Sequence, residues 1–367
     1  MITSIRLQNF KGHRDTTVPL GRLTVLVGPN GTGKTSVLEA LAIQSQLAID
    51  APHVVFRGDR SREDLLRRGG ENHISLISQG IASQDSWRFS TDITVVAPSE
   101  QVSSLSCEWK HGEDARVNRN WSNGFHGDLS QIRRVMGVAT LYKLSAQKIA
   151  AAAYAESVDS VIEYDGANAA VVLAAIKLGQ DEAFATIEAN LRLVIPNVER
   201  IRLRTAMVRY YNDDDRGSQE RPGNKIFFDF RGAAKVPAHM ASEGTLIALA
   251  ILTILHGPDR PDVLLLDDFD QSLHPQAQIE MVRLLKRLLE KLPDVQIVAT
   301  THSPYILDEI EPQDVVVFAL RPDGTVATKR LSEHPQAAKM KDALSAGQLW
   351  SLDPEADWVP DEATAAQ

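Results

Sequence analysis

The fold is decided by the stretch Gly28-Pro29-Asn30-Gly31-Thr32-Gly33-Lys34-Thr35, which fits the pattern G-x-x-x-x-G-K-[ST]. A short, β-branched apolar run precedes it at Leu23–Val27, and apolar residues recur at helical spacing over Lys34–Ile49. Glycines let successive backbone amides point at phosphate oxygens, while the helix N-terminus adds a partial positive charge. The sequence therefore predicts a phosphate-binding loop between a buried strand and a helix, rather than a glycine turn with a chance lysine.

The polar residues of this loop have separate predicted roles. Lys34 reaches the β- and γ-phosphates of a nucleotide, and the Thr35 hydroxyl ligates Mg²⁺. ATP and Mg²⁺ are thus the predicted cofactors. The residues assigned to nucleotide binding are Asn30, Gly31, Thr32, Gly33, Lys34, Thr35 and Ser36.

Two later apolar runs also end in polar side chains. Asp267 and Asp268 follow Val263–Leu266, and His302 follows Val295–Thr300. Each pattern alone fits a strand end that faces solvent, but parallel strands bring their carboxyl ends to the edge where ligands bind. We therefore expect Asp267 to hold Mg²⁺, directly or through water. Asp268 is expected to polarise the attacking water, and His302 to hydrogen-bond that water or the γ-phosphate.

Composition excludes several other classes of protein. The chain has 367 residues and one cysteine, which rules out a disulfide framework and a multi-cysteine metal site. Its longest apolar run, Thr245–Leu255, is too short to span a bilayer, and no signal peptide is visible. We expect a cytoplasmic protein with no membrane partner. A net charge of −9 argues against a uniformly basic nucleic-acid coat but leaves room for local basic patches.

The order of the motifs resembles that of the ABC-class P-loop ATPases, in particular the RecF/SMC/OLD-like branch. Ser242-Glu243-Gly244-Thr245 alone fits an ordinary helix cap, but here it precedes the paired acids as the family's signature does. The opening Ile5–Gly12 and the later Leu273-His274-Pro275 are similar to the same branch. The compact size and the tail Leu344–Trp350 resemble the stand-alone bacterial AAA-type ATPases of defence and toxin–antitoxin operons.

This resemblance implies an α/β fold, namely a P-loop NTPase head of the ABC type with inserted β-rich and helical lobes. Residues 1–147 would hold the N-terminal part of the head with the phosphate loop and the β-rich lobe. A helical lobe would follow at 148–197. The C-terminal part of the head, with the signature, the paired acids and the switch histidine, would occupy 198–330, and a tail 331–367.

The resemblance also implies a head-to-head homodimer closed by ATP. Ser242 and Gly244 of one subunit would contact the ATP bound to the other, and His302 would act as the switch histidine. Gln147 is the first candidate for the glutamine that senses Mg²⁺, and Gln79 is the second. A protein effector from the same operon, either a nuclease or a toxin, is the expected partner, with DNA as a further candidate.

Two departures from the family pattern bear on turnover. Asp268 stands where the family usually has glutamate, so its carboxylate sits about one methylene farther from the water and hydrolysis is expected to be slow. Glu243 replaces the usual second glycine of the signature. One hypothesis is an ATP-driven switch that acts on DNA or controls a partner effector, in phage defence or DNA repair. The alternative is a slow nucleotide-sensing scaffold that restrains a toxin or nuclease, while a membrane-transporter subunit fits least.

Two groups of arginines are candidate contacts to a phosphate backbone. The first lies between a phosphate loop and a β-rich region, beside acids that would neutralise it on a solvated helix face; its members are Arg57, Arg60, Arg62, Arg67 and Arg68. The second alternates along the expected strand Val198–Tyr211, where it would make one basic sheet face; its members are Arg200, Arg202, Arg204 and Arg209.

Overall fold

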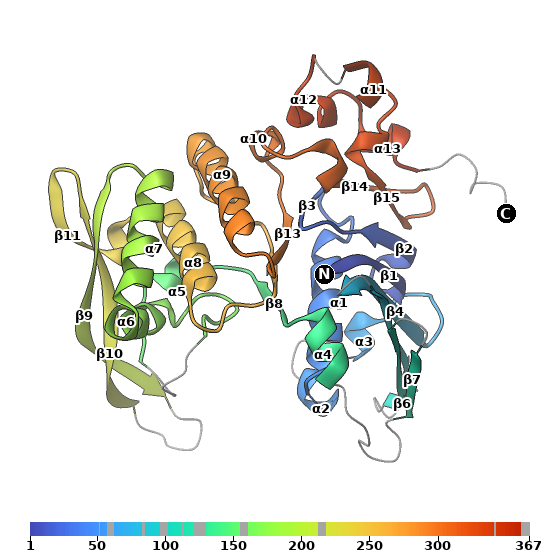
Figure 1. The fold of residues 1–367 in the computed structure, drawn as a ribbon, viewed down its shortest axis with the longest axis horizontal. Helices are drawn as coiled ribbons and strands as arrows, with labels where there is room; N and C mark the ends of the chain where they lie inside the picture. The colour runs from blue at the N-terminus through green and yellow to red at the C-terminus, as the bar shows by residue number, and fades with distance from the viewer. Residues whose placement is uncertain are drawn as a thin grey trace. The chain divides into compact units, whose positions relative to one another are not determined.

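The computed structural model describes residues 1–50, 52–56, 62–82, 85–95, 102–111, 114–120, 130–154, 161–211, 218–340 and 343–360. The chain forms two compact units that alternate along the sequence (Figure 1). The first unit contains Met1–Leu141, Asp262–Asp267 and Leu292–Gln367, and the second contains Tyr142–Pro261 and Asp268–Lys291. The division into segments 1–147, 148–197, 198–330 and 331–367 stays a prediction about domains.

The first unit is built on a mostly parallel sheet in the order β15-β14-β3-β13-β12-β8. Its central strands are parallel and almost wholly buried, which explains their uninterrupted apolar sequences. The α/β fold that the resemblance implies is thus confirmed. The strands are β3 (Leu23–Val27), β8 (Ala139–Tyr142), β12 (Val263–Leu266), β13 (Gln296–Thr300), β14 (Val315–Leu320) and β15 (Val326–Arg330).

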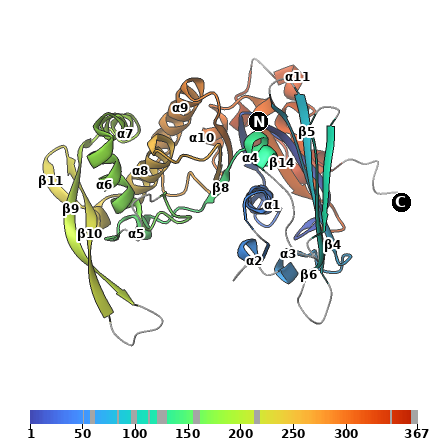
Figure 2. The same ribbon diagram turned by 60° about the horizontal axis from the view of Figure 1, so that its bottom comes forward.

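A second, antiparallel sheet in this unit has the order β2-β1-β4-β5-β6-β7. It joins the four strands between residues 73 and 120 to the first two strands of the chain. Figure 2 shows β4, β5 and β6 nearly edge-on, with α1 (Lys34–Leu47) alongside. The strands are β1 (Ile2–Phe10), β2 (His13–Pro19), β4 (His73–Ala82), β5 (Asp85–Val95), β6 (Val102–His111) and β7 (Asp114–Asn120).

Helix α1 contacts strands of both sheets, so it is buried around most of its circumference. Its polar residues are accordingly bonded inside the core. Gln44 donates from Nε2 to the Leu76 carbonyl at 2.9 Å, and the Ser45 hydroxyl accepts the Ala139 N–H at 2.8 Å. A buried polar group that finds such partners costs little, which is why these side chains are tolerated in an otherwise apolar helix.

Short helices complete the first unit. They are α2 (Pro52–Val55), α3 (Arg62–Leu65), α4 (Ser130–Met136), α10 (Pro304–Leu307), η3 (Pro312–Asp314), η4 (Leu331–Glu333), α11 (Ala337–Met340), α12 (Ala346–Trp350) and α13 (Glu355–Trp358).

The second unit packs helices on a three-stranded antiparallel sheet, β11-β10-β9. Helix α8 is buried from Gly244 to Leu255, so the longest apolar run of the chain is a core helix. No helix in the described ranges is long and apolar enough to cross a membrane. The elements are α5 (Ala146–Ile149), α6 (Ala169–Gly179), α7 (Asp181–Val194), β9 (Val198–Tyr211), β10 (Ser218–Phe230), β11 (Ala233–Pro237), η2 (Ala238–Met240), α8 (Glu243–His256) and α9 (Pro275–Lys291).

The N-terminal part of β10 contains two residues that favour turns. Residues 212–217 lie outside the described ranges, but Ser218–Gly223 continue β10 and pair with Ala206–Tyr211 of β9. Pro222 and Gly223 read locally as turn residues. They remain extended because the long partner strand supplies a continuous pairing register.

Gln296 ties the two sheets of the first unit together. Its side chain is 2% exposed, accepts the Ile2 N–H at 3.0 Å and donates to the carbonyls of Ile2 and Gly21, both at 2.7 Å. The start of β1 is therefore held by the side-chain amide of Gln296 at the start of β13.

Replacing Gln296 with leucine should lower the free energy of unfolding by about 2–4 kcal/mol, because a buried N–H and two carbonyls lose their partner. Urea unfolding of the full chain measures this loss. The exposed Gln313→Leu variant is the matched control and should stay within about 0.5 kcal/mol of wild type. Equal stabilities of the two variants would contradict the assigned role of Gln296.

Candidate nucleotide-binding site

Three neighbouring strands of the first unit end at one edge of the parallel sheet. β13 lies between β3 and β12, with Thr300 opposite Leu26 and Ala299 opposite Leu266. The phosphate-binding loop follows β3, Asp267 follows β12, and Thr301-His302-Ser303 follows β13. The structure therefore brings these three predicted elements to the same edge, as the parallel arrangement requires.

The loop backbone takes conformations that favour glycine. Gly31 and Gly33 have φ of +79° and +86°, and a Cβ at Gly28 would lie 2.3 Å from the Phe318 carbonyl of β14. Lys34 is buried, and its Nζ donates to the carbonyls of Gly28 and Pro29 at 2.8 Å each. An ammonium beside a glycine-rich loop, at the start of a 14-residue helix, fits a polyphosphate.

Asp267 is the centre of the predicted metal site. Its side chain is 4% exposed, and its Oδ1 accepts the hydroxyls of Thr35 at 2.8 Å and of Thr300 at 2.9 Å. These bonds fix the carboxylate beside the loop threonine. A hydroxyl and a carboxylate oxygen are the hard ligands that Mg²⁺ prefers, so this donor set fits Mg²⁺ carried by a nucleotide.

His302 is exposed on a turn that its neighbours fix. The buried Thr301 donates its N–H to the Leu26 carbonyl at 3.2 Å, and its hydroxyl accepts the Ser303 N–H at 3.0 Å. The turn is thus anchored to the strand that carries the phosphate-binding loop. The exposed His302 therefore lies on an anchored turn at this edge of the sheet.

The C-terminal tail packs behind this turn. Helix α12, which contains most of the tail Leu344–Trp350, contacts α10, the helix that begins two residues after His302. Gly347 donates its N–H to Asp308 Oδ1 at 3.0 Å, and a Cβ on Gly347 would lie 2.3 Å from the Pro304 carbonyl. The tail motif therefore has a structural role against the helix after His302.

His13 is a site residue that the sequence analysis missed. It is fully buried, and its Nε2 lies 3.1 Å from the Gly33 carbonyl, to which it donates as a neutral imidazole. Burial lowers its pKa to about 4, and Nδ1 has no hydrogen-bond partner among the described residues. A Cβ on Gly33 would lie 2.5 Å from Nε2, so the ring touches the loop backbone directly.

The signature residues belong to the second unit. Ser242 caps α8, because its hydroxyl accepts the Thr245 N–H at 3.3 Å. Gly244 is packed so closely that a Cβ would lie 2.7 Å from the Ser272 carbonyl. Glu243 accepts the Ser272 hydroxyl at 2.5 Å. The residue that replaces the usual second glycine therefore links the start of α8 to the turn that leads into α9.

Asp268 begins the second-unit segment directly after Asp267. Its φ is +49°, a left-handed conformation that costs an L residue about 1–2 kcal/mol. The Asp268 carbonyl accepts the Gln271 N–H at 3.0 Å, which starts a tight turn. The two neighbouring aspartates thus have separate surroundings, one fixed in the sheet of the first unit and one on a strained turn of the second.

The two glutamine candidates lie on different units. Gln147 is exposed on α5 and lines a cavity of about 330 Å³ in the second unit, together with Lys225, Phe227 and His239. Gln79 lies on β4 of the first unit, where its Oε1 accepts the Ser4 hydroxyl at 3.5 Å. Both assignments stay predictions.

A glycine-rich loop between a parallel strand and a helix, with an aspartate hydrogen-bonded to the loop threonine, defines the class of P-loop ATPases. Residues 148–308 match the family described as "AAA domain, putative AbiEii toxin, Type IV TA system", and residues 1–78 match an "AAA ATPase domain". The two matched segments hold the phosphate-binding loop, the signature, the paired acids and His302, so the resemblance to P-loop ATPases that the order of the motifs indicates is confirmed.

Solved SMC heads share this fold. One is an SMC head bound to the C-terminal winged-helix domain of ScpA, with a TM-score of 0.59 and 13% identity over 90% of this chain and 98% of that one. Another, derived from Pyrococcus furiosus, has an extended coiled coil and is bound to the C-terminal domain of ScpA. Its TM-score is 0.54, and it is 13% identical over 93% of this chain and 98% of that one. At this identity the likeness concerns the fold alone.

Curated relatives match over short segments. The Septu protein PtuA of Bacillus thuringiensis is 34% identical over 73 residues, which are 20% of this chain and 18% of PtuA. The OLD nuclease of Thermus scotoductus is 46% identical over 41 residues, 11% of this chain and 8% of the nuclease. The Rad50 ATPase of Methanopyrus kandleri is 38% identical over 63 residues, which are 16% of this chain and 7% of the Rad50 ATPase. The chain thus spans less than a fifth of each relative.

The burial of His13 predicts a pH dependence of stability. Unfolded histidine binds a proton below pH 6.5, whereas the buried ring resists protonation down to about pH 4. The unfolded state then binds more protons, so stability is full above pH 6.5 and falls by about 3 kcal/mol as the pH drops to 4.

His13→Gln keeps an N–H donor for Gly33 without a titrating group, so this variant should lose about 3 kcal/mol less than wild type between pH 7 and pH 4. Urea unfolding at both pH values measures the difference. Parallel losses in the two proteins would contradict a buried neutral His13.

Proposed function

We propose that the protein binds Mg·ATP at the phosphate-binding loop and hydrolyses it within an ATP-closed homodimer, to control a partner in antiviral defence. The observation that carries the proposal is the hydrogen bond of the Thr35 hydroxyl to Asp267, at 2.8 Å, beside the buried Lys34. This arrangement places a cation, a hydroxyl and a carboxylate at one edge of the sheet. The cytoplasm is the proposed location.

Each residue of the first unit has a part in the proposed reaction. Lys34 exchanges its bonds to the loop carbonyls for bonds to the β- and γ-phosphates, and the loop amides hold the remaining oxygens. Thr35 and Asp267 would hold Mg²⁺, which would neutralise charge on the phosphate oxygens during phosphoryl transfer. His302 hydrogen-bonds the γ-phosphate or the water that attacks it. His13 keeps the loop backbone at Gly33 in place.

Asp268 accepts a hydrogen bond from the attacking water in this scheme. Water attacks the γ-phosphorus, the bond to the bridging oxygen breaks, and ADP and inorganic phosphate are released. Because Asp268 is shorter than glutamate, its carboxylate is set back from the water, which slows the step. Gln147 is the proposed Mg²⁺-sensing glutamine.

The second copy of the chain supplies its signature to this site. Ser242 and Gly244 lie at the N-terminus of α8, a helix of 14 residues, where unpaired amides and the helix dipole favour an anion. In the proposed dimer they contact the γ-phosphate of the ATP bound to the other subunit. The bond of Glu243 to Ser272 would transmit that contact to the turn that begins at Asp268.

A second candidate function is a slow nucleotide-sensing scaffold that restrains a toxin or nuclease. Asp268 at the position of the usual glutamate favours it, because slow hydrolysis leaves the dimer closed. The similarity to the Septu protein PtuA and to an OLD nuclease supports a role in defence with an effector, either a nuclease or a toxin.

Substitutions of Asp268 separate the two functions. Asp268→Asn should reduce phosphate release at least about 100-fold with ATP affinity unchanged, since it removes the group that positions water. Asp268→Glu should accelerate release. Steady-state phosphate release, with light scattering for the ATP-bound dimer, measures both effects.

Asp181→Asn is the control for these variants, because Asp181 is an exposed carboxylate of the same unit. The scaffold hypothesis instead predicts that wild type already turns over as slowly as Asp268→Asn. Fast phosphate release by Asp268→Asn would contradict the role that both candidate functions give to Asp268.

A further inference from the structure

The pairing register of β9 and β10 divides their side chains between two faces. Residues directly opposite each other share a face, and Arg200, Arg202 and Arg204 lie opposite Asp229, Phe227 and Lys225. Farther along, Arg221 lies opposite Val208 on this same face. We call the face the basic face; its cations are Arg200, Arg202, Arg204, Arg221 and Lys225.

The opposite face is the one that the body of the second unit covers. Ile201, Ile226 and Phe228 are at most 3% exposed, and β9 and β10 contact α6 and α7. The cations of the basic face other than Arg202 are exposed. In both views the hairpin extends beyond the ends of α6 and α7 (Figures 1 and 2).

Arg209 does not belong to the basic face, contrary to the expectation from the sequence. It lies an odd number of residues from Arg204, so the strand period of two turns it to the other face. There its Nε lies 3.1 Å from Glu220 Oε1. Arg200, Arg202 and Arg204 are two residues apart and share a face, whereas the step of five residues from Arg204 to Arg209 changes the face.

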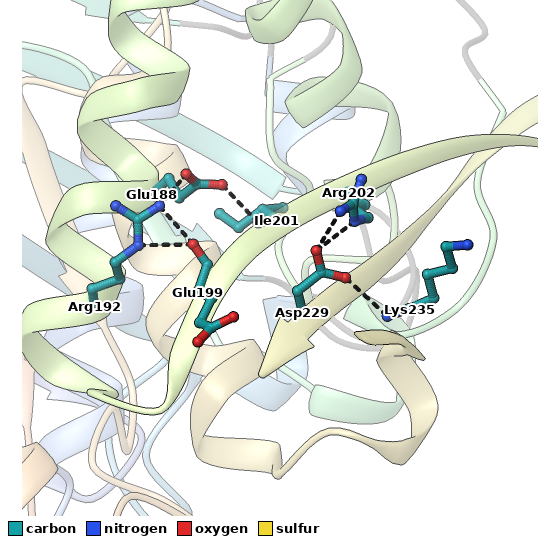
Figure 3. Close-up of polar contacts among 7 residues, drawn as sticks. All are labelled: Glu188, Arg192, Glu199, Ile201, Arg202, Asp229 and Lys235. Carbon is teal, nitrogen blue, oxygen red and sulfur yellow. Dashed lines mark hydrogen bonds and ion pairs between the residues drawn. The ribbon is translucent and has the colours of Figure 1, made fainter. Parts of the chain in front are cut away.

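Among the described side chains of β9 and β10, one carboxylate, Asp229, lies on the basic face. It is hydrogen-bonded within the second unit. Asp229 accepts Arg202 Nε at 2.6 Å and the Lys235 N–H at 2.9 Å, as Figure 3 shows. Arg202 holds the pKa of Asp229 at about 2, so this carboxylate stays charged. Five cations and one carboxylate give the face a net charge of +4 in a chain of −9.

The base of the hairpin is fixed to α7. Arg192 donates to the Glu199 carbonyl at 2.9 Å and Glu188 accepts the Ile201 N–H at 2.8 Å (Figure 3). Arg204 stacks over the Phe227 ring at 5.0 Å, and Arg221 over the Tyr154 ring at 5.4 Å. Guanidinium groups held against rings lose less freedom when they bind a partner.

We propose that this basic face binds the phosphate backbone of double-stranded DNA. Arg200, Arg202 and Arg204 repeat every second residue, about 6.6–6.8 Å apart along the strand, and so present a regular line of cations to a regular line of anions. Four of the five cations are arginine, whose planar fork bonds phosphate through two N–H groups. A two-stranded ribbon also fits the major groove of B-DNA.

This inference names a partner for the proposed function, but the binding itself does not require ATP. DNA binding by the basic face and ATP hydrolysis at the phosphate-binding loop can therefore fail separately. An acidic protein is the competing occupant, and it lacks the even spacing of phosphates that the line of arginines matches.

The test is the binding of a fluorescent 30-base-pair duplex to the full chain without nucleotide, followed by anisotropy from 50 to 200 mM salt. The variant Arg200→Glu, Arg204→Glu, Lys225→Glu should bind at least about 100-fold more weakly. The slope of log K against log salt should become smaller by about 3, because three phosphate contacts are lost.

The matched control changes three exposed cations of the same unit that lie off the basic face: Arg209→Glu, Arg260→Glu, Lys291→Glu. It alters net charge equally and should keep most of the wild-type affinity. Unchanged ATP affinity in both triple variants shows that they fold, and Lys34→Ala should still bind the duplex.

Three results would overturn the proposal. The first is that the wild-type chain does not bind the duplex at 50 mM salt. The second is that the control triple variant loses as much affinity as the basic-face triple variant. The third is that polyglutamate competes for the protein as well as unlabelled duplex does. The last would assign the face to an acidic protein. Loss of ATP binding alone would contradict the proposed function and leave DNA binding intact.

Discussion

The hydrogen bond between Thr35 and Asp267 joins parts of the chain that are 232 residues apart in sequence. It forms only if β3, β13 and β12 are parallel neighbours in that order, since each strand then delivers its next residue to the same edge. Long-range pairings of this kind must bury enough apolar surface to offset the entropy of closing a long loop. The wholly buried strands and the doubly covered helix α1 provide that burial.

The same constraint explains why the polar residues of the first unit stand where they do. Gln296 holds β1 against the start of β13, while His13 and Thr300 bond groups at the other end of these strands. The loop is therefore held at the Gly33 carbonyl by an imidazole and at the Thr35 hydroxyl by a carboxylate. The chain passes to the second unit between Asp267 and Asp268, so the proposed metal ligand and the proposed water-positioning residue belong to different units.

Much of this fold could be predicted from local sequence. The apolar run Val263–Leu266 is β12 residue for residue, and the apolar run Thr245–Leu255 lies within α8. Residues that depend on a distant partner could not be found in this way. His13 carries no sequence signal beyond its place after Phe10, because its role comes from contact with Gly33. The strand Ser218–Gly223 and the face of Arg209 likewise follow from pairing with β9.

The arginine cluster between the phosphate-binding loop and the antiparallel sheet stays a prediction. Arg57 and Arg60 lie outside the described residues, and only the backbone of Arg62 is described.

The central claim is that Thr35 and Asp267 together hold the Mg²⁺ of a bound nucleotide. Its most direct test is calorimetric titration of ATP with and without Mg²⁺ into wild type, Thr35→Ser and Thr35→Val. We expect Mg²⁺ to tighten ATP binding at least about tenfold in wild type and in Thr35→Ser, which keeps the hydroxyl ligand. Thr35→Val should bind ATP with little dependence on Mg²⁺. The same Mg²⁺ dependence in Thr35→Val, or wild-type protein that does not bind ATP, would contradict the account.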